Sequence, residues 1–137
     1  MRQTVPLFAA LAITLLAQQA ARSVWDGVYT AEQANRGESA YKRECARCHG
    51  DTLTGGEAAP PLAGGEFLAN WNGLTVGDLF ERIRISMPAD RPGTLTNERN
   101  SDIIAHILRA NQFPAGKAEL EHRAEALKQI QLEAAKQ

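Results

Sequence analysis

Two cysteines and a histidine lie together in residues 45–49, which read C-A-R-C-H. In this C-x-x-C-H pattern the thiols sit on adjacent turns at a helix end, where each can form a thioether with one vinyl group of a single haem. His49 follows directly, so its imidazole is placed to bind the iron as the proximal ligand. The pattern predicts one covalently attached haem c, bound through Cys45 and Cys48.

Other proteins use a C-x-x-C pair for different chemistry. A thioredoxin-like redox pair needs a strand-to-helix context, and none precedes this motif. Structural zinc needs four nitrogen or sulfur ligands, whereas the chain has two cysteines and three histidines, with His106 and His122 far downstream. A lone disulfide agrees with the cysteine count alone. A histidine directly after the second cysteine fits none of these uses.

Met87 is the candidate for the second axial ligand. Met1 is the initiator, so Met87 is the one methionine available as a thioether ligand. Methionine usually packs in a core, but a methionine held by Pro88 after a helix, in a haem protein, favours ligation. His/Met ligation fills both axial positions and raises the reduction potential relative to His/His. His106 is the alternative ligand, although a histidine on a helix face near Tyr41 is the simpler interpretation.

Helices are needed before, between and after these residues, and the sequence predicts three: 30–45, 75–86 and 97–111. Capping boxes, Thr30-x-x-Gln33 and Thr75-x-x-Asp78, begin the first two. The second ends near residue 86 because a residue before proline disfavours helical geometry. Gly37, in the middle of the first helix, costs up to about 1 kcal/mol against alanine, which indicates close approach of another helix.

The remaining segments have weaker signals. Residues 50–77 hold seven of the eleven glycines and no periodicity, so we expect a loop that wraps the cofactor and packs Phe67 and Leu68 against it. Residues 24–29 are expected to form an arm, with Trp25 on the domain surface. Residues 115–137 are predicted to form a charged helical tail that docks on the domain, contacts a partner or frays.

Residues 1–23 have the pattern of a secretory signal peptide: a charged start, an apolar run and a small-residue end. Cleavage is expected after Ser23, with Ala20 and Ala21 as other sites. An uncleaved membrane anchor is the alternative, although the apolar run is shorter than the roughly 20 residues of a spanning helix. Export to the periplasm agrees with C-x-x-C-H chemistry, because bacteria attach haem to this motif outside the cytoplasm.

Residues 30–114 resemble the small bacterial monohaem class I c-type cytochromes, on the evidence of C-x-x-C-H, the downstream Met-Pro and the surrounding helices. The resemblance implies an all-α cytochrome c fold, with three to four core helices around one haem, here followed by the helical tail. It also implies that the Pro60 carbonyl accepts the Nδ1–H of His49, that Leu62 packs on the porphyrin, and that Trp71 lies near a propionate. Gly37 and Tyr41 match the glycine and aromatic of the first helix at its crossing with the last.

The same resemblance implies an electron carrier, not an enzyme, that serves redox donor and acceptor proteins. Residues 60–92 also look like cytochromes that accompany, or are fused to, periplasmic quinoprotein dehydrogenases. One alternative is a haem enzyme or gas sensor with a labile sixth site; another is a docking subunit that uses the 117–137 helix. A net charge of −1 at pH 7 gives no basic surface for nucleic acid.

Overall fold

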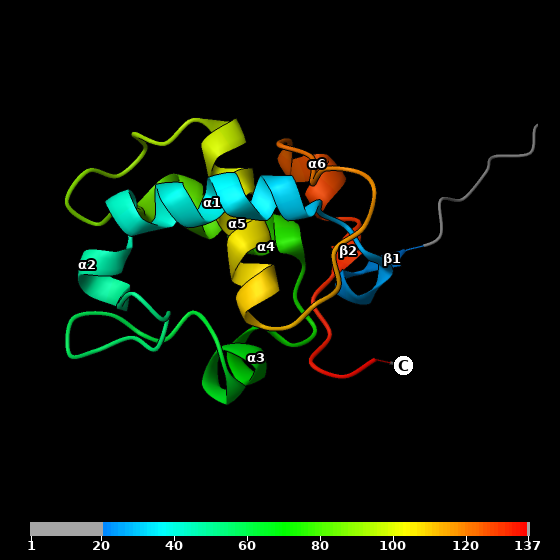
Figure 1. Ribbon diagram of the computed structural model, residues 1–137, viewed down its shortest axis with the longest axis horizontal. Helices are drawn as coiled ribbons and strands as arrows, with labels where there is room; N and C mark the ends of the chain where they lie inside the picture. The colour runs from blue at the N-terminus through cyan, green and yellow to red at the C-terminus, as the bar shows by residue number, and fades with distance from the viewer. Residues whose placement is uncertain (1–20, 137) are drawn as a thin grey trace, which may run out of the picture.

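The computed structural model describes residues 21–136, and within them it is mostly helical (Figure 1). The elements are β1 (Arg22–Ser23), the short 3-10 helix η1 (Val24–Asp26), α1 (Ala31–Glu44), α2 (Ala46–His49), α3 (Gly65–Trp71), α4 (Val76–Ser86), α5 (Asn97–Ala110), α6 (Ala124–Leu127) and β2 (Ile130–Gln131). The expected all-α fold class is confirmed. Except for its last three residues, the expected signal segment 1–23 lies outside the described residues.

Helices α1 and α5 cross at the centre of the molecule (Figure 1). They touch at Gly37, where an added Cβ would lie 1.7 Å from the Asp102 carbonyl oxygen. The close approach expected from the sequence is therefore confirmed, and only glycine allows it. Beside the crossing, the Arg36 guanidinium donates two hydrogen bonds of 3.0 Å to the Asp102 carboxylate.

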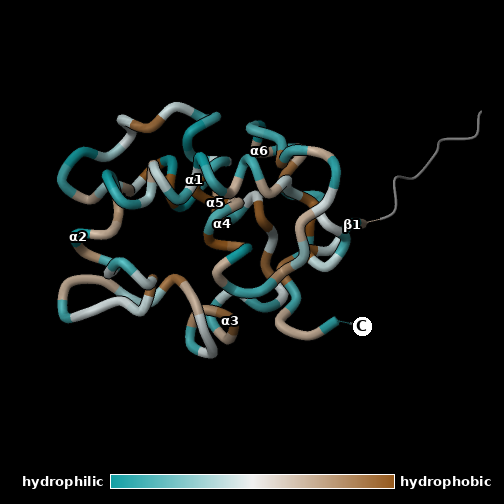
Figure 2. The backbone as a smooth tube through the Cα atoms, in the orientation of Figure 1, coloured by the Kyte–Doolittle hydropathy of each residue, from teal (hydrophilic) through white to brown (hydrophobic). Residues whose placement is uncertain are grey.

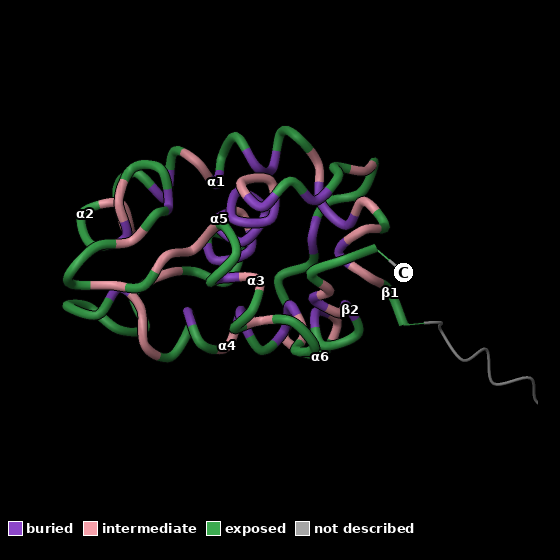
Figure 3. The backbone as a smooth tube through the Cα atoms, turned by 90° about the horizontal axis from the view of Figure 1, so that it is seen from below, coloured by how far each residue is buried: buried purple, intermediate pink, exposed green. Residues whose placement is uncertain are grey.

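The apolar faces of the helices form the core. Figure 2 shows hydrophobic stretches of α4 and α5 in the middle of the molecule, and Figure 3 shows α5 buried along most of its length. Ile103, Ile104 and Leu108 are fully buried there. The apolar residues of α5 recur with the 3.6-residue period of a helix, so they share one face. This face packs against α1 and α4.

Helices α1 and α4 begin at the threonines that the sequence predicted as their N-caps. The Thr30 hydroxyl accepts the Gln33 N–H at 3.1 Å, and Thr75 and Asp78 cap each other's backbone. The predicted capping box of α1 is half wrong, because the Gln33 side chain does not return to residue 30. It is buried instead and exchanges hydrogen bonds of 3.0 and 2.7 Å with the backbone of Leu120.

The glycine-rich region 50–77 contains a helix that the sequence analysis did not predict. Helix α3 begins after Gly64, whose φ of 88° is left-handed, and no side chain caps it. It buries Phe67, whose ring centroid lies 6.1 Å from that of Trp71. The helix has two turns and no capping residue, so tertiary packing must stabilise it.

The predicted C-terminal helix over 115–137 is present only as α6, and the prediction is wrong for the rest of residues 115–136. The tail lies along the domain, where it contacts α4, and its strand β2 pairs in parallel with β1. Its backbone bonds to the segment before α4: the Gly73 N–H donates to the Leu132 carbonyl, and the Leu132 N–H to the Leu74 carbonyl, both at 2.9 Å. The apolar side chains of the tail are buried in the core: Leu120, Leu127, Ile130 and Leu132.

The N-terminal arm is part of the same packing. The Trp25 ring meets Phe113 edge-on at 4.9 Å, and its Nε1–H donates to the Glu133 carbonyl at 2.9 Å. The Tyr29 hydroxyl donates to the Phe113 carbonyl at 2.6 Å. None of the helices formed by residues 21–136 has the length and apolar character needed to cross a bilayer.

Candidate haem-attachment site

Helix α2 carries Cys48 and His49 of the C-x-x-C-H motif, and Cys45 is the residue directly before it. Cys45 is half-buried between α1 and α2, Cys48 is exposed, and both thiols are free. Burial, helped by the charges of Glu44 and Cys48, raises the pKa of the Cys45 thiol to about 11. The short helix ends in His49, whose N–H donates to the Cys45 carbonyl at 3.0 Å. One helical turn therefore holds all three side chains.

The His49 ring is buried and held through Nδ1, which lies 2.8 Å from the Pro60 carbonyl oxygen. A carbonyl only accepts hydrogen bonds, so Nδ1 carries a proton, and in the neutral ring Nε2 then keeps its lone pair. This is the tautomer that coordinates a metal through Nε2. The hydrogen bond implied by the resemblance is present; its role at a haem stays a prediction.

Backbone hydrogen bonds shape the loop that carries Pro60. The Gly55 N–H donates to the His49 carbonyl at 2.8 Å, and the Leu62 N–H to the Leu53 carbonyl at 2.8 Å. Gly55 has a φ of 73°, and a Cβ there would lie 2.5 Å from the Pro61 nitrogen. This glycine therefore lets the loop fold back on itself beneath the two prolines.

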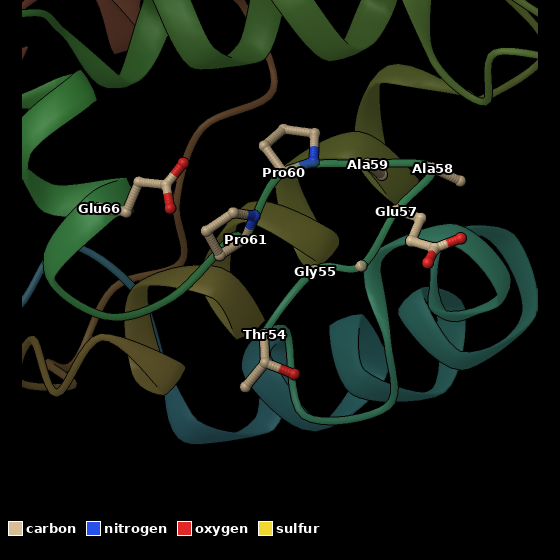
Figure 4. Close-up of a pocket in the computed structure, with 9 residues that line it drawn as sticks. Thr54, Gly55, Glu57, Ala58, Ala59, Pro60, Pro61 and Glu66 are labelled. Carbon is tan, nitrogen blue, oxygen red and sulfur yellow. The ribbon is translucent and has the colours of Figure 1, made fainter.

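An open cavity of about 560 Å³ lies against the same loop, lined by residues 54–61 and Glu66. In Figure 4, Glu66 of α3 and Glu57 lie on opposite sides of the two prolines. Neither the cysteines nor His49 and Met87 line it. Across residues 21–136, no three His, Cys, Asp or Glu side chains are grouped to hold a metal ion.

Asn111, which the sequence analysis missed, joins this loop to the end of α5. Its Oδ1 accepts the Gly64 N–H at 3.0 Å, and its Nδ2 donates to the carbonyls of Leu62 and Ile107 at 3.0 and 2.9 Å. Asparagine after the last apolar residue of a helix is a recognisable capping signal. The sequence could therefore have indicated that Asn111 ends a helix, but not that its side chain bonds to the loop that carries Pro60.

Met87 lies at the end of α4, as the sequence predicted. Its N–H donates to the Ile83 carbonyl at 2.9 Å, and its extended backbone ends the helix before Pro88. The peptide bond between Met87 and Pro88 is cis. The Met87 side chain is half-buried against the core. Ligation by Met87, on a different element from His49, stays a prediction.

His106 lies on α5 near Tyr41, as the simpler interpretation expected. The two ring centroids are 5.3 Å apart, and Arg109 Nη2 lies 3.3 Å from His106 Nδ1. Burial and the Arg109 charge lower the pKa of His106. Its position in the contact between α1 and α5 explains its burial without a metal.

The donor set fits a covalently bound haem. Two free thiols and one imidazole with the correct tautomer are what thioether attachment and proximal ligation require, whereas the described residues, 21–136, hold no cluster of the ligands that a structural zinc ion needs. Leu62 follows the two prolines of the loop, and Trp71 is the last residue of α3; both are half-buried against the core. Their contacts with a porphyrin stay predictions.

Fold and site together define a class I c-type cytochrome. The chain belongs to the family described as cytochrome c oxidase, cbb3-type, subunit III, whose model matches residues 32–107, more than half of its length. As a c-type cytochrome it binds haem c and carries electrons.

A solved structure has a similar fold. It is the sulfane dehydrogenase SoxCD from Paracoccus pantotrophus, with a TM-score of 0.55 and 22% sequence identity over 90% of this chain and 68% of that chain. At this identity the similarity concerns the fold alone. No curated protein matches the sequence.

Proposed function

We propose that the chain is a periplasmic electron carrier with one haem c, attached to Cys45 and Cys48 and ligated by His49 and Met87. The observation that carries the proposal is the 2.8 Å contact between His49 Nδ1 and the Pro60 carbonyl oxygen. It leaves Nε2 of a buried histidine available as an axial ligand. The bound haem supplies a one-electron couple between Fe(II) and Fe(III).

The protein's part in this function is to hold the ligands still. The Pro60 carbonyl fixes the orientation of the His49 ring and increases its basicity. The end of α4 and the buried Pro88 hold Met87. Ligands on packed elements move little when the iron changes between its oxidised and reduced states. Burial of the site tunes the reduction potential of the haem.

A sixth position filled by Met87 favours a carrier over a haem enzyme or a gas sensor, which need an open or labile site. The docking-subunit alternative relied on a free 117–137 helix. The structure gives no support to this alternative, because residues 117–136 pack against the cytochrome domain of the same chain. SoxCD is a sulfane dehydrogenase, which supports a dehydrogenase as the redox partner of this chain, and we propose one of the periplasmic quinoprotein type.

Export would place signal cleavage before Arg22 and not after Ser23. Ser23 is used by the fold: its Oγ accepts the Trp25 N–H at 3.3 Å and donates to the Glu133 carboxylate at 2.5 Å. Arg22 pairs with Ile130 in the small sheet. The mass of the mature protein tests this, with Ala21 or Arg22 expected as its first residue; a start at Val24 would contradict it.

The test of ligation is the absorption spectrum of the protein made in a host that matures cytochromes c. We expect one haem per chain by pyridine haemochrome and mass, and the weak long-wavelength band of an Fe–S(Met) bond in the oxidised protein. Met87→Ala should abolish this band and allow the reduced protein to bind CO. Ile85→Ala, at a side chain that is 63% exposed, is the matched control and should retain it.

Two results would overturn the proposal. A wild-type spectrum without the Fe–S(Met) band, or a band that Met87→Ala leaves unchanged, would exclude Met87 as the ligand. Rapid CO binding by the reduced wild-type protein at neutral pH would favour the enzyme or sensor alternative. His106→Gln then tests the alternative ligand, because loss of a six-coordinate spectrum in that variant would identify it.

A further inference from the structure

Glu44 lies where three segments of the chain meet. It is the last residue of α1, directly before Cys45, and its side chain is only 14% exposed. Its carboxylate accepts a hydrogen bond from Arg91 Nη2 at 3.0 Å, and Arg99 Nη1 lies 4.0 Å from its other oxygen. One carboxylate next to the haem-attachment motif therefore faces two arginines from a distant part of the sequence.

One of the two arginines lies within the loop that follows Met87, and the other lies in α5, just after the loop ends. Arg91 is in the turn after Pro88: its N–H donates to the Pro88 carbonyl at 2.9 Å, and its own carbonyl accepts the Thr94 hydroxyl at 2.8 Å. Arg99 lies in the first turn of α5. In Figure 1 this loop, between α4 and α5, passes beside the end of α1 that leads to α2.

The contacts form a short path from one candidate haem-binding segment to the other. Arg91 is bonded through its backbone to Pro88, and through its side chain to Glu44. Asp90, at 3.7 Å, is the other acid near Arg91, but it is on the same loop and cannot tie it to α1. Loss of the contact between Arg91 and Glu44 would release the middle of the Met87 loop, while α4 and α5 would still hold its two ends.

We propose that Glu44 is a positioning residue that clamps the Met87 loop, through Arg91, onto the haem-attachment segment, and so limits how readily Met87 leaves the iron. The proposal rests on the proposed ligation by Met87. A loop held in the ligating conformation lowers the population of the open state, and an external ligand binds in proportion to that population. Breaking the clamp should therefore make the sixth position accessible without changing the attached haem.

The test is an imidazole titration of the oxidised haem-loaded protein, followed by the loss of the Fe–S(Met) band. Arg91→Gln should increase the apparent affinity for imidazole about three- to fivefold, the effect of a partly exposed ion pair. Glu44→Gln, which removes the shared partner of both arginines, should increase it at least as much. Arg91→Lys keeps the charge and should stay closer to the wild type.

Arg36→Gln is the matched control. It breaks the ion pair with Asp102 between α1 and α5, so it weakens the fold without touching the Met87 loop, and should leave imidazole affinity unchanged. Guanidinium unfolding of each variant separates loop opening from global loss of stability. If the Glu44→Gln variant does not attach haem, because residue 44 is next to Cys45, the imidazole affinity of Arg91→Gln still tests the clamp.

Two failures have different meanings. If the wild type shows the Fe–S(Met) band but Arg91→Gln and Arg36→Gln both bind imidazole like the wild type, the clamp is overturned and ligation by Met87 stands. If the wild type lacks the band, both the clamp and the proposed ligation are overturned. An increase in affinity common to Arg91→Gln and Arg36→Gln would also overturn the clamp, because it would reflect general destabilisation.

Discussion

The Nδ1 atom of His49 and the carbonyl oxygen of Pro60 are 2.8 Å apart. The contact fixes the histidine tautomer, and its acceptor belongs to a stretch, residues 54–60, that is mostly exposed. The position of Pro60 therefore depends on hydrogen bonds that hold the loop to the rest of the domain. Asn111 makes two of them, to the residues that follow the prolines.

Asn111→Ala should lower the free energy of unfolding of the haem-loaded protein by about 1–3 kcal/mol, because it removes three hydrogen bonds of a buried side chain and leaves the partly buried Gly64 N–H and Leu62 carbonyl without this partner. It should also change the reduction potential, since the His49 partner loses its support. Guanidinium unfolding and a redox titration measure the two effects. Asn70→Ala, at an exposed asparagine of α3, is the control and should remain within about 0.5 kcal/mol of the wild type.

Gly37→Ala should destabilise the protein by about 3 kcal/mol, because the new Cβ would meet the backbone of α5 at Asp102. Gly65→Ala is the matched change: an added Cβ at Gly65 in α3 meets nothing within 4 Å, and alanine is favoured over glycine in a helix by up to about 1 kcal/mol. Thermal or guanidinium unfolding compares them. Equal stabilities would contradict the close crossing of α1 and α5.

Leu127→Ala should cost about 2–5 kcal/mol, the range for truncating a buried leucine, because the Leu127 side chain is fully buried in α6. Leu74→Ala removes the same atoms from a residue that is 43% exposed and should cost much less. Denaturant unfolding measures both changes. A Leu127→Ala protein as stable as Leu74→Ala would mean that the C-terminal tail does not pack on the domain.

The lowered pKa of His106 predicts a loss of stability in mild acid. At pH values above its ordinary pKa of 6.5, His106 is neutral in both the folded and the unfolded protein. As the pH falls below that value, the unfolded chain binds the proton first, because burial and Arg109 disfavour the charged ring in the fold.

His106→Gln removes this titration, so its free energy of unfolding should fall less than that of the wild type between pH 7 and pH 5 (about the range in which an unperturbed histidine titrates). Unfolding curves at several pH values measure the difference, with the values above pH 7 as the reference. Parallel pH profiles for the two proteins would show that His106 does not contribute.

The sequence allowed the main helices to be predicted because their signals are local. Thr30 and Thr75 cap helices through residues a few positions away, and Pro88 ends α4 beside Met87. Helix α3 and the packed tail could not be predicted in this way. Helix α3 has no capping side chain, and the tail's partners at 72–74 and in β1 are more than fifty residues away in the sequence.

The sequence by itself determined the chemistry of the site. Two thiols and an imidazole in C-x-x-C-H are brought together by a single helical turn, so no distant contact is needed to place them. Only the tertiary structure decided what holds them: the Pro60 carbonyl at His49, Asn111 on the loop, and Glu44 opposite Arg91. These contacts join residues from separate elements, and such pairings depend on how the helices pack, which no local pattern specifies.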